Sequence, residues 1–285
     1  MKKILFLFVL CSQFMNAIEV GSFEEAQKLA LGTNKIIVVD FWATWCGPCI
    51  RMDFNTWNDE RVKSAMNDFI FVKIDIDKNR ELANKYNVKS IPNIFFLDGN
   101  GFSIHNILGY KTPNEIIKYL ENYNISTEII SIELINQYKK PNYYNLLKLI
   151  SKYYDFTLYA DNDLKGDLLH VCSLYLDESN NYLSKKEENY VKKKQKIELI
   201  KLFTLAYNFN FDKLDKKISE IKIAEIDESN YFDYWFLKYI STKALGKETS
   251  VMEEQLKNNE LENVITDSNK LYAFYLKSKE KKTIE

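Results

Sequence analysis

Residues 42–49 of the chain read Trp-Ala-Thr-Trp-Cys-Gly-Pro-Cys, and they follow an apolar run at residues 36–39 and the acidic residue Asp40. Two cysteines separated by two residues at a strand-to-helix junction can form a small, reversible disulfide. The helix N-terminus beside the first sulfur stabilises the thiolate of that cysteine, which is the form that attacks other disulfides. The stretch therefore predicts redox chemistry at Cys46 and Cys49.

The length and composition of the chain predict two domains. Its 285 residues, 46% of them hydrophobic, are sufficient for two ordinary cores. We expect a first domain at residues 18–124 and a second, all-helical domain at residues 125–285. The formal net charge is only −1, so a nucleic-acid partner has no electrostatic support.

The beginning of the sequence has the pattern of a secretory signal peptide at residues 1–17. A basic start at residues 1–3 precedes an apolar run at residues 4–11 and a segment that ends at Ala17. Because the apolar run is too short to span a membrane as a helix, we expect cleavage after Ala17 and a periplasmic or otherwise extracytoplasmic protein. If the segment is retained, it would tether the protein to the membrane.

The cysteine content indicates that disulfides do not stabilise the fold. Cleavage after residue 17 would leave Cys46, Cys49 and Cys172. Exported proteins that rely on disulfides usually carry more cysteines, in matched pairs. We therefore interpret the close pair as chemistry, and Cys172 as a buried free thiol in preference to a third redox centre.

Helix and strand signals alternate through residues 18–124. Ser22 and Glu25 form a capping box that opens a helix, which Gly32 can close. The predicted order is helix, strand, helix, strand, helix, strand, strand, helix. Strands are expected at residues 36–43, 69–76, 92–97 and 102–109, and helices at residues 22–32, 50–66, 78–86 and 112–124.

This order resembles that of the thioredoxin family, and further residues match the motifs of that family. Asp40 stands six residues before Cys46, where thioredoxins have a buried aspartate, and Lys73 matches the lysine that faces this aspartate. Residues 90–92 match the loop that carries a cis proline, and Gly109 matches a glycine that leaves room for a substrate chain. The resemblance implies an α/β thioredoxin fold, with a central mixed sheet flanked by helices.

The resemblance also implies roles for the matching residues. Cys46 would be the nucleophile, Cys49 the resolving thiol, Asp40 the proton-transfer group and Lys73 the partner of Asp40. The residues implied in substrate binding are Trp45, Gly47, Pro48, Ile91, Pro92 (predicted cis) and Gly109.

Simpler interpretations of three of these residues stay open at this point. Asp40 could be an exposed strand-end residue, Lys73 a solvated surface lysine and Pro92 an ordinary proline at the start of a strand. A metal site is not expected, because a zinc site needs four ligands and His105 and His170 are the only histidines. We expect no cofactor other than the redox-active disulfide.

Residues 125–285 are less informative. Helical periodicity predicts about six to eight helices, in a bundle or an irregular solenoid. One apolar face is expected at residues 164, 168, 172 and 175, and another at residues 232, 235, 236, 239 and 240. Most of the 19 tyrosines lie in this part, either in an amphipathic groove for peptides or in ordinary core packing.

We therefore expect an exported oxidoreductase that reduces disulfide-containing protein substrates and receives electrons from a membrane thiol donor. Gly47 and Pro48 between the cysteines, and the apolar Ile91, resemble the reducing members of the family. The alternatives are an oxidase or isomerase that donates its disulfide, and a chaperone-like binding module in which the cysteines are incidental.

Overall fold

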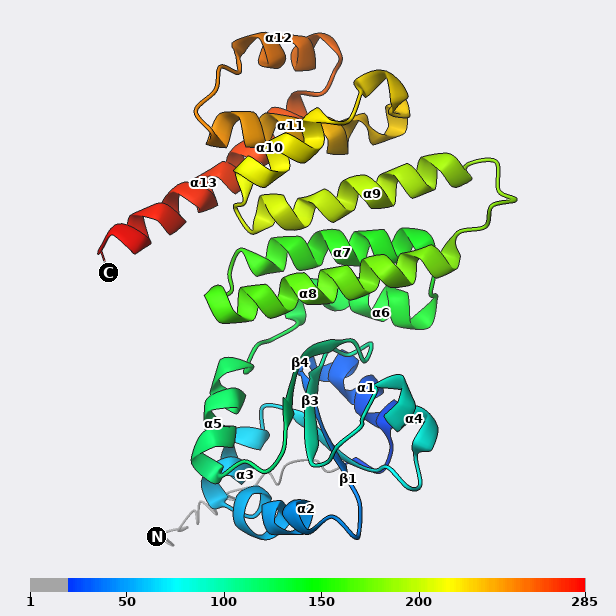
Figure 1. Cartoon of the computed structure of the whole chain (residues 1–285), viewed down its shortest axis with the longest axis vertical. Coiled ribbons are helices and arrows are strands. Elements are labelled where there is room, and N and C mark those ends of the chain that lie inside the picture. Colours follow the sequence, from blue (N-terminus) through cyan, green and yellow to red (C-terminus); the bar gives the residue numbers. More distant parts are fainter. Residues whose placement is uncertain (1–19, 285) are drawn as a thin grey trace, which may run out of the picture. The chain divides into compact units, whose positions relative to one another are not determined.

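The computed structural model describes residues 20–284, and the expected signal peptide lies outside this range. Contacts within the chain divide it into two compact units (Figure 1). The first unit holds the residues up to Gly99 together with residues 106–126, and the second holds residues 100–105 and 127–285. Within residues 20–284, no helix has both the length and the apolar character needed to cross a membrane.

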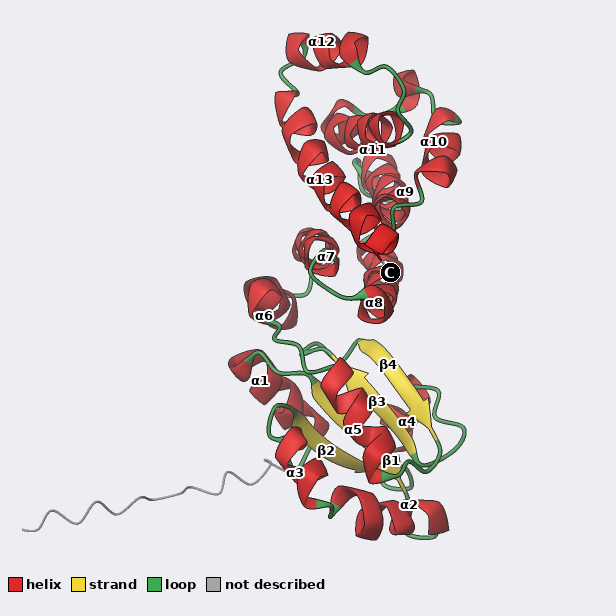
Figure 2. Cartoon of the chain, turned by 90° about the vertical axis from the view of Figure 1, so that its left-hand side faces the viewer, coloured by secondary structure: helices red, strands yellow, loops and turns green. Residues whose placement is uncertain are grey.

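A four-stranded mixed sheet forms the centre of the first unit (Figure 2). The strand order is β2-β1-β3-β4, and β1 runs parallel to β2 and antiparallel to β3. The strands are β1 (Ile37–Trp42), β2 (Ile70–Asp75), β3 (Asn93–Leu97) and β4 (Ser103–Leu108). The five residues Ile37 to Phe41 of β1 are buried, and all of them except Asp40 are apolar.

Helices cover both faces of the sheet. Figure 1 shows α1 (Phe23–Thr33) and α4 (Arg80–Lys85) on one side and α3 (Glu60–Met66) and α5 (Pro113–Asn122) on the other. The helix α2 (Gly47–Met52) follows β1 and continues into the π-helical turn η1 (Asp53–Trp57). This arrangement confirms the predicted α/β thioredoxin fold.

Aromatic packing consolidates one face of the sheet. The ring of Phe41 in β1 lies 5.5 Å from that of Phe95 in β3, and Tyr86 packs against both. One predicted helix end was wrong: Gly32 is inside α1, and the helix is capped at its end by Asn34, which adopts the left-handed conformation with φ 57°. Asparagine tolerates this conformation because its short polar side chain can bond locally.

From residue 127 onward the second unit is helical, as predicted, in the part that the structure describes, whereas its residues 103–105 belong to β4. Among its contacts, α8 packs on α7, while α10 and α13 pack on α11. The helices are α6 (Ser131–Lys139), α7 (Tyr143–Thr157), α8 (Asn162–Ser179), α9 (Tyr190–Tyr207), α10 (Phe211–Ser219), α11 (Tyr231–Ala244), α12 (Ser250–Asn258) and α13 (Glu262–Ile284).

The apolar face predicted in α8 is buried throughout. The face predicted in α11 was too narrow. Phe232 and Trp235 are only half-buried, whereas Tyr234 and Leu237, outside the predicted face, are buried. Neighbouring helices contact α11 on several sides, so its burial extends around more of the helix than one stripe.

Candidate active site

Cys46 and Cys49 are joined by a disulfide at the start of α2. Cys46 is the N-cap residue of this helix, and its Sγ accepts a hydrogen bond of 3.2 Å from the backbone N–H of Cys49. Pro48 occupies the first turn, where the missing N–H of a proline costs nothing. The local sequence therefore places the first sulfur on the exposed amide end of a helix, where a thiolate is stabilised.

Both sulfurs are covered in the disulfide form. Cys46 is 3% exposed and Cys49 is 2% exposed. The reason is that the side chain of Cys46 turns inward and packs with Ala43 and Cys49. The exposed rim consists of Trp45, Gly47 and Pro48, three residues that were predicted to contact substrate.

Asp40 lies in β1 and is only 2% exposed. Its Oδ2 accepts a hydrogen bond of 3.0 Å from Nε1 of Trp57, while its Oδ1 has no hydrogen-bond partner among residues 20–284. Burial raises the pKa of Asp40 to about 6, although Lys73 and the Trp57 hydrogen bond act in the opposite direction. A carboxyl group with this pKa can exchange protons near neutral pH.

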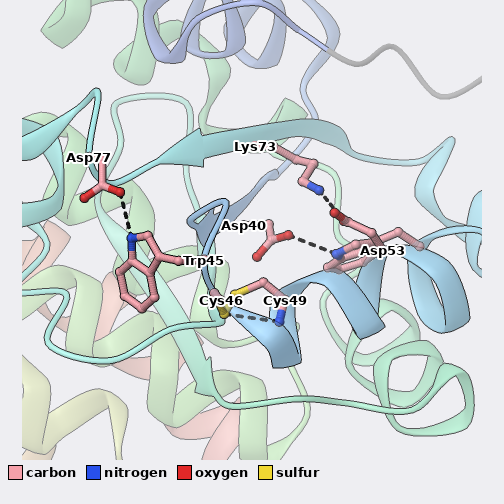
Figure 3. Close-up of a disulfide and its surroundings, with 8 residues drawn as sticks. Asp40, Trp45, Cys46, Cys49, Asp53, Lys73 and Asp77 are labelled. Carbon is pink, nitrogen blue, oxygen red and sulfur yellow. Dashed lines mark hydrogen bonds and ion pairs between the residues drawn. A yellow bond between two sulfur atoms is a disulfide. The ribbon is translucent and has the colours of Figure 1, made fainter.

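Lys73 is opposite Asp40 in the parallel register of β1 and β2, but its ion pair is with Asp53. The ammonium group also stands 4.7 Å from the ring centre of Trp42. Lys73 thus faces Asp40 in the sheet, as predicted, and acts on it through space by lowering the pKa of that carboxyl group, while its ion pair is made with Asp53. Figure 3 shows Asp40 between the disulfide and the Lys73–Asp53 pair.

Two residues of the site, Asp53 and Trp57, were not predicted, and they contact Lys73 and Asp40 respectively. A signal was present, because Cys49, Asp53 and Trp57 follow one another at intervals of four residues. Residues at this spacing share one face of a helix, and here that face turns toward β1 and β2. Both residues belong to η1, and single π-helical turns are frequent at functional sites.

Trp45 is held at the edge of the site. It is 66% exposed, and its Nε1 donates a hydrogen bond of 2.8 Å to Oδ2 of Asp77 (Figure 3). This bond fixes a large apolar ring beside Cys46, where it can contact an incoming chain.

The Ile91–Pro92 peptide bond is cis, and Ile91 packs against the two cysteines and Ala43. The backbone N–H of Gly109 donates a hydrogen bond of 2.8 Å to the carbonyl oxygen of Pro92. Gly109 has φ +82°, a conformation that favours glycine, and a Cβ atom at this position would meet no atom within 4 Å. The loops of Pro92 and Gly109 therefore meet beside the disulfide.

Two further features bear on metal and thiol chemistry. No group of three histidine, cysteine or acidic side chains within residues 20–284 could hold a metal ion. Cys172 is a free and buried thiol in α8, and burial raises its pKa well above the usual range. A thiol of this kind is a poor nucleophile.

The second unit contains a cavity of about 380 Å³ between α7, α9 and α11. Five of its eleven lining residues are aromatic, and two lysines and one aspartate form its charged part. Tyr144, Tyr154 and Tyr207 line this cavity, whereas Tyr153, Tyr175 and Tyr239 belong to the core. Tyrosines therefore take part in core packing, and some of them also line this cavity, while a groove for peptides stays a prediction.

Comparisons with known proteins concern the first unit. The family model described as thioredoxin matches residues 18–122. The thioredoxin of Mycoplasmoides gallisepticum is 39% identical over 92 residues, which cover 32% of this chain and 87% of that protein. The thioredoxin of Bacillus subtilis is 38% identical over 91 residues, which cover 32% of this chain and 83% of that protein.

Among solved structures, the chain is similar to the reduced C-terminal domain of DsbD from Neisseria meningitidis, with 26% identity and a TM-score of 0.32. That match covers 35% of this chain and 92% of the solved one. The two bacterial thioredoxins share more than a third of the aligned residues with this chain and are covered for more than four fifths of their length. The chain therefore belongs to the thioredoxin family and is a thiol–disulfide oxidoreductase, as its sequence motifs predicted.

Proposed function

We propose that this protein is an exported reductase, which uses the Cys46–Cys49 dithiol to reduce disulfides in protein substrates. The observation that carries the proposal is the buried carboxyl group of Asp40, with a pKa of about 6, on the strand that leads to the cysteines. At neutral pH this group is mostly ionised, so it is a proton acceptor. A reductase needs such an acceptor, because its second thiol must lose a proton to resolve the mixed disulfide.

In the first step, the thiolate of Cys46 attacks one sulfur of the substrate disulfide. The substrate S–S bond breaks, a mixed disulfide forms, and the released substrate sulfur takes up a proton. In the second step, Cys49 gives its proton to Oδ1 of Asp40 and attacks the sulfur of Cys46. The Cys46–Cys49 bond forms, and the second substrate sulfur leaves as a thiolate that is then protonated. The protein loses two electrons and the substrate gains them.

Two considerations support the proposed location and electron source. The pattern at residues 1–17 is that of a signal peptide, with a basic start and a short apolar run. An exported dithiol has no access to a cytosolic reductase, so we propose that a membrane protein with a thiol pair reduces it again. Mass spectrometry of the protein from the cell envelope would test the first point, since cleavage after Ala17 gives a new N-terminus at Ile18.

We propose that the helical unit selects substrates or docks a partner. The cavity between α7, α9 and α11 supports this role, because aromatic walls with a few polar groups are common in binding sites. Deletion of the helical unit should then slow the reduction of protein disulfides more than the reduction of a small aromatic disulfide. Equal effects on both substrates would argue against a role in selection.

The equilibrium reduction potential of the Cys46–Cys49 pair tests the direction of electron flow. We expect a value near about −270 mV, as in thioredoxin, in glutathione or dithiothreitol buffers. A value of about −120 to −180 mV would favour an oxidase or isomerase instead.

Replacement of Cys46 tests whether the cysteines are needed at all. Cys46→Ser should abolish disulfide reduction, whereas Cys49→Ser should trap a mixed disulfide that is visible on a non-reducing gel. If Cys46→Ser retained the full activity of the protein toward its clients, a chaperone-like function would be the better conclusion.

A further inference from the structure

The ion-pair partner of Lys73 is not the residue that the strand register places opposite it. The register of β1 and β2 sets Lys73 directly opposite Asp40. Nevertheless, Nζ of Lys73 is paired with Oδ1 of Asp53, a residue of η1. Two carboxyl groups thus compete for one ammonium group, and Asp53 holds it.

The two carboxyl groups differ in their access to water. The side chain of Asp53 is 33% exposed, so this carboxylate keeps part of its hydration. Asp40 is 2% exposed and loses that hydration. Because Asp53 stays partly hydrated, its carboxylate can pair with Lys73 at a smaller desolvation cost than the buried carboxylate of Asp40 would require.

Because Lys73 pairs with Asp53, Asp40 has no ion-pair partner among the described residues, and its hydrogen bonds reflect this. Its Oδ2 accepts the indole N–H of Trp57, but its Oδ1 has no hydrogen-bond partner in the described part of the chain. Buried carboxyl oxygens are rarely left unpaired without a functional reason. In Figure 3 one oxygen of this carboxyl group bonds to the neighbouring indole, and the other oxygen faces the disulfide. We therefore take Oδ1 as the oxygen that can accept a proton from Cys49.

Few charged groups act on Asp40. Lys73 lowers its pKa and Asp53 raises it, while the neighbouring indole of Trp57 also lowers it. Farther along β2, Asp75 is paired with Lys78 at 3.6 Å. The residue opposite Asp40 on β3 is Ile94, which carries no charge. Burial has the largest effect on the pKa of Asp40, and among the charged groups of the described residues Lys73 is the cation that opposes it.

We infer that Asp53 is a positioning residue: by binding Lys73, it keeps this lysine from pairing with Asp40 and preserves the proton affinity that Asp40 needs as the base for Cys49. This inference rests on the proposed function only for the role of Asp40 in resolving the mixed disulfide. With Lys73 bound to it, Asp40 would be a weaker base and would accept the Cys49 proton less readily.

The pKa of Asp40 can be measured without any substrate, by NMR of the side-chain carboxyl carbon in the reduced protein from pH 3 to 9. Asp53→Asn releases Lys73, so the titration midpoint of Asp40 should fall by about one pH unit. Lys73→Met should raise the midpoint. In a background that already carries Lys73→Met, Asp53→Asn should produce less than half of the shift that it produces alone.

Matched variants separate this effect from a general change of charge. Asp53→Glu keeps a carboxylate and should leave the midpoint close to that of the parent protein. Glu60→Gln removes an exposed carboxylate that pairs with Lys63 in α3, and it should leave the midpoint unchanged. Circular dichroism of each variant would verify that it is folded.

Two results would overturn the inference. One is a titration midpoint of Asp40 that does not move in Asp53→Asn. The other is a shift of equal size with and without Lys73, which would mean that Asp53 acts by its own charge alone. The rate of mixed-disulfide resolution should depend on pH in the same way as the titration of Asp40. Its acidic limb should therefore lie at lower pH in Asp53→Asn than in the parent protein. If the parent protein had no reductase activity, the proposed function would be refuted, but the NMR result on the pKa of Asp40 would still be valid.

Discussion

The indole nitrogen of Trp57 donates a hydrogen bond of 3.0 Å to Oδ2 of the buried Asp40, across 17 residues of sequence. This bond joins the turn that follows α2 to the strand that precedes the cysteines. An indole N–H is only a donor, so it stabilises the ionised carboxylate more than the protonated acid. The bond thus opposes the effect of burial on Asp40.

Replacing Asp40 should make the fold more stable at neutral pH. The pKa of Asp40 is raised to about 6 in the folded protein, above the usual value of a carboxyl group. The folded state therefore binds this proton more tightly than the unfolded state, and stability falls as the pH rises from about 4 to about 6. Asp40→Asn should remove this slope and raise the free energy of unfolding at pH 7 by about 1–3 kcal/mol.

Urea unfolding of the oxidised protein at several pH values measures this effect. An unchanged slope between pH 4 and 6 in Asp40→Asn would contradict the prediction. The same variant should resolve its mixed disulfide more slowly, so stability and activity should change in opposite directions.

Trp57→Phe should raise the pKa of Asp40 still further. Phenylalanine keeps an aromatic ring next to Phe71, whose ring centre lies 4.9 Å away, but it cannot donate the hydrogen bond. Hydrogen bonds to charged groups contribute about 1.5–3 kcal/mol, so the midpoint should rise by roughly one pH unit or more. Trp45→Phe is the control, because its indole bonds to the exposed Asp77; a midpoint that moves equally in both variants would argue against the assigned bond.

Cys172 should take no part in the redox cycle. It is buried in α8, and its raised pKa keeps it protonated at neutral pH. In the native protein, Cys172 should resist alkylation by iodoacetamide, and mass spectrometry should detect its modification only after unfolding. Cys172→Ala should leave the reduction rate unchanged and cost about 1–2 kcal/mol of stability, because a buried sulfur is lost. Rapid labelling in the native state would show that the thiol is accessible.

The same substitution at two glycines should have opposite effects. Gly109 has φ +82°, so Gly109→Ala should destabilise the protein by about 1–2 kcal/mol through backbone strain. Gly166 is inside α8, where an added Cβ atom would meet no atom within 4 Å, and Gly166→Ala should stabilise that helix by up to about 1 kcal/mol. Thermal or urea unfolding of the two variants measures both, and a gain of stability at Gly109 would mean that strain is not what requires glycine there.

Much of the first unit could be predicted from local sequence signals. Buried strands of apolar residues and helix caps are local features, and the structure follows them within a few residues. The strand register that places Lys73 opposite Asp40 could also be predicted, because the family resemblance pairs these two residues.

The ion pair of Lys73 could not be predicted in the same way. The choice between Asp40 and Asp53 depends on how much water each carboxyl group keeps, and burial of this kind is set by the tertiary structure. The π-helical turn that carries Asp53 is likewise invisible to a pattern based on regular α-helical spacing. In α11, contacts with several neighbouring helices made the buried surface wider than the apolar stripe in the sequence.

One atom has two tasks at the start of α2. The Sγ of Cys46 is both the reacting sulfur and the acceptor that caps the helix through the Cys49 amide. A sulfur atom keeps lone pairs as a thiolate, in a mixed disulfide and in the internal disulfide, so it can serve as the cap at every stage of the cycle. The disulfide can therefore form and break without unwinding the first turn of the helix, so the reacting sulfur stays at the same place throughout the cycle.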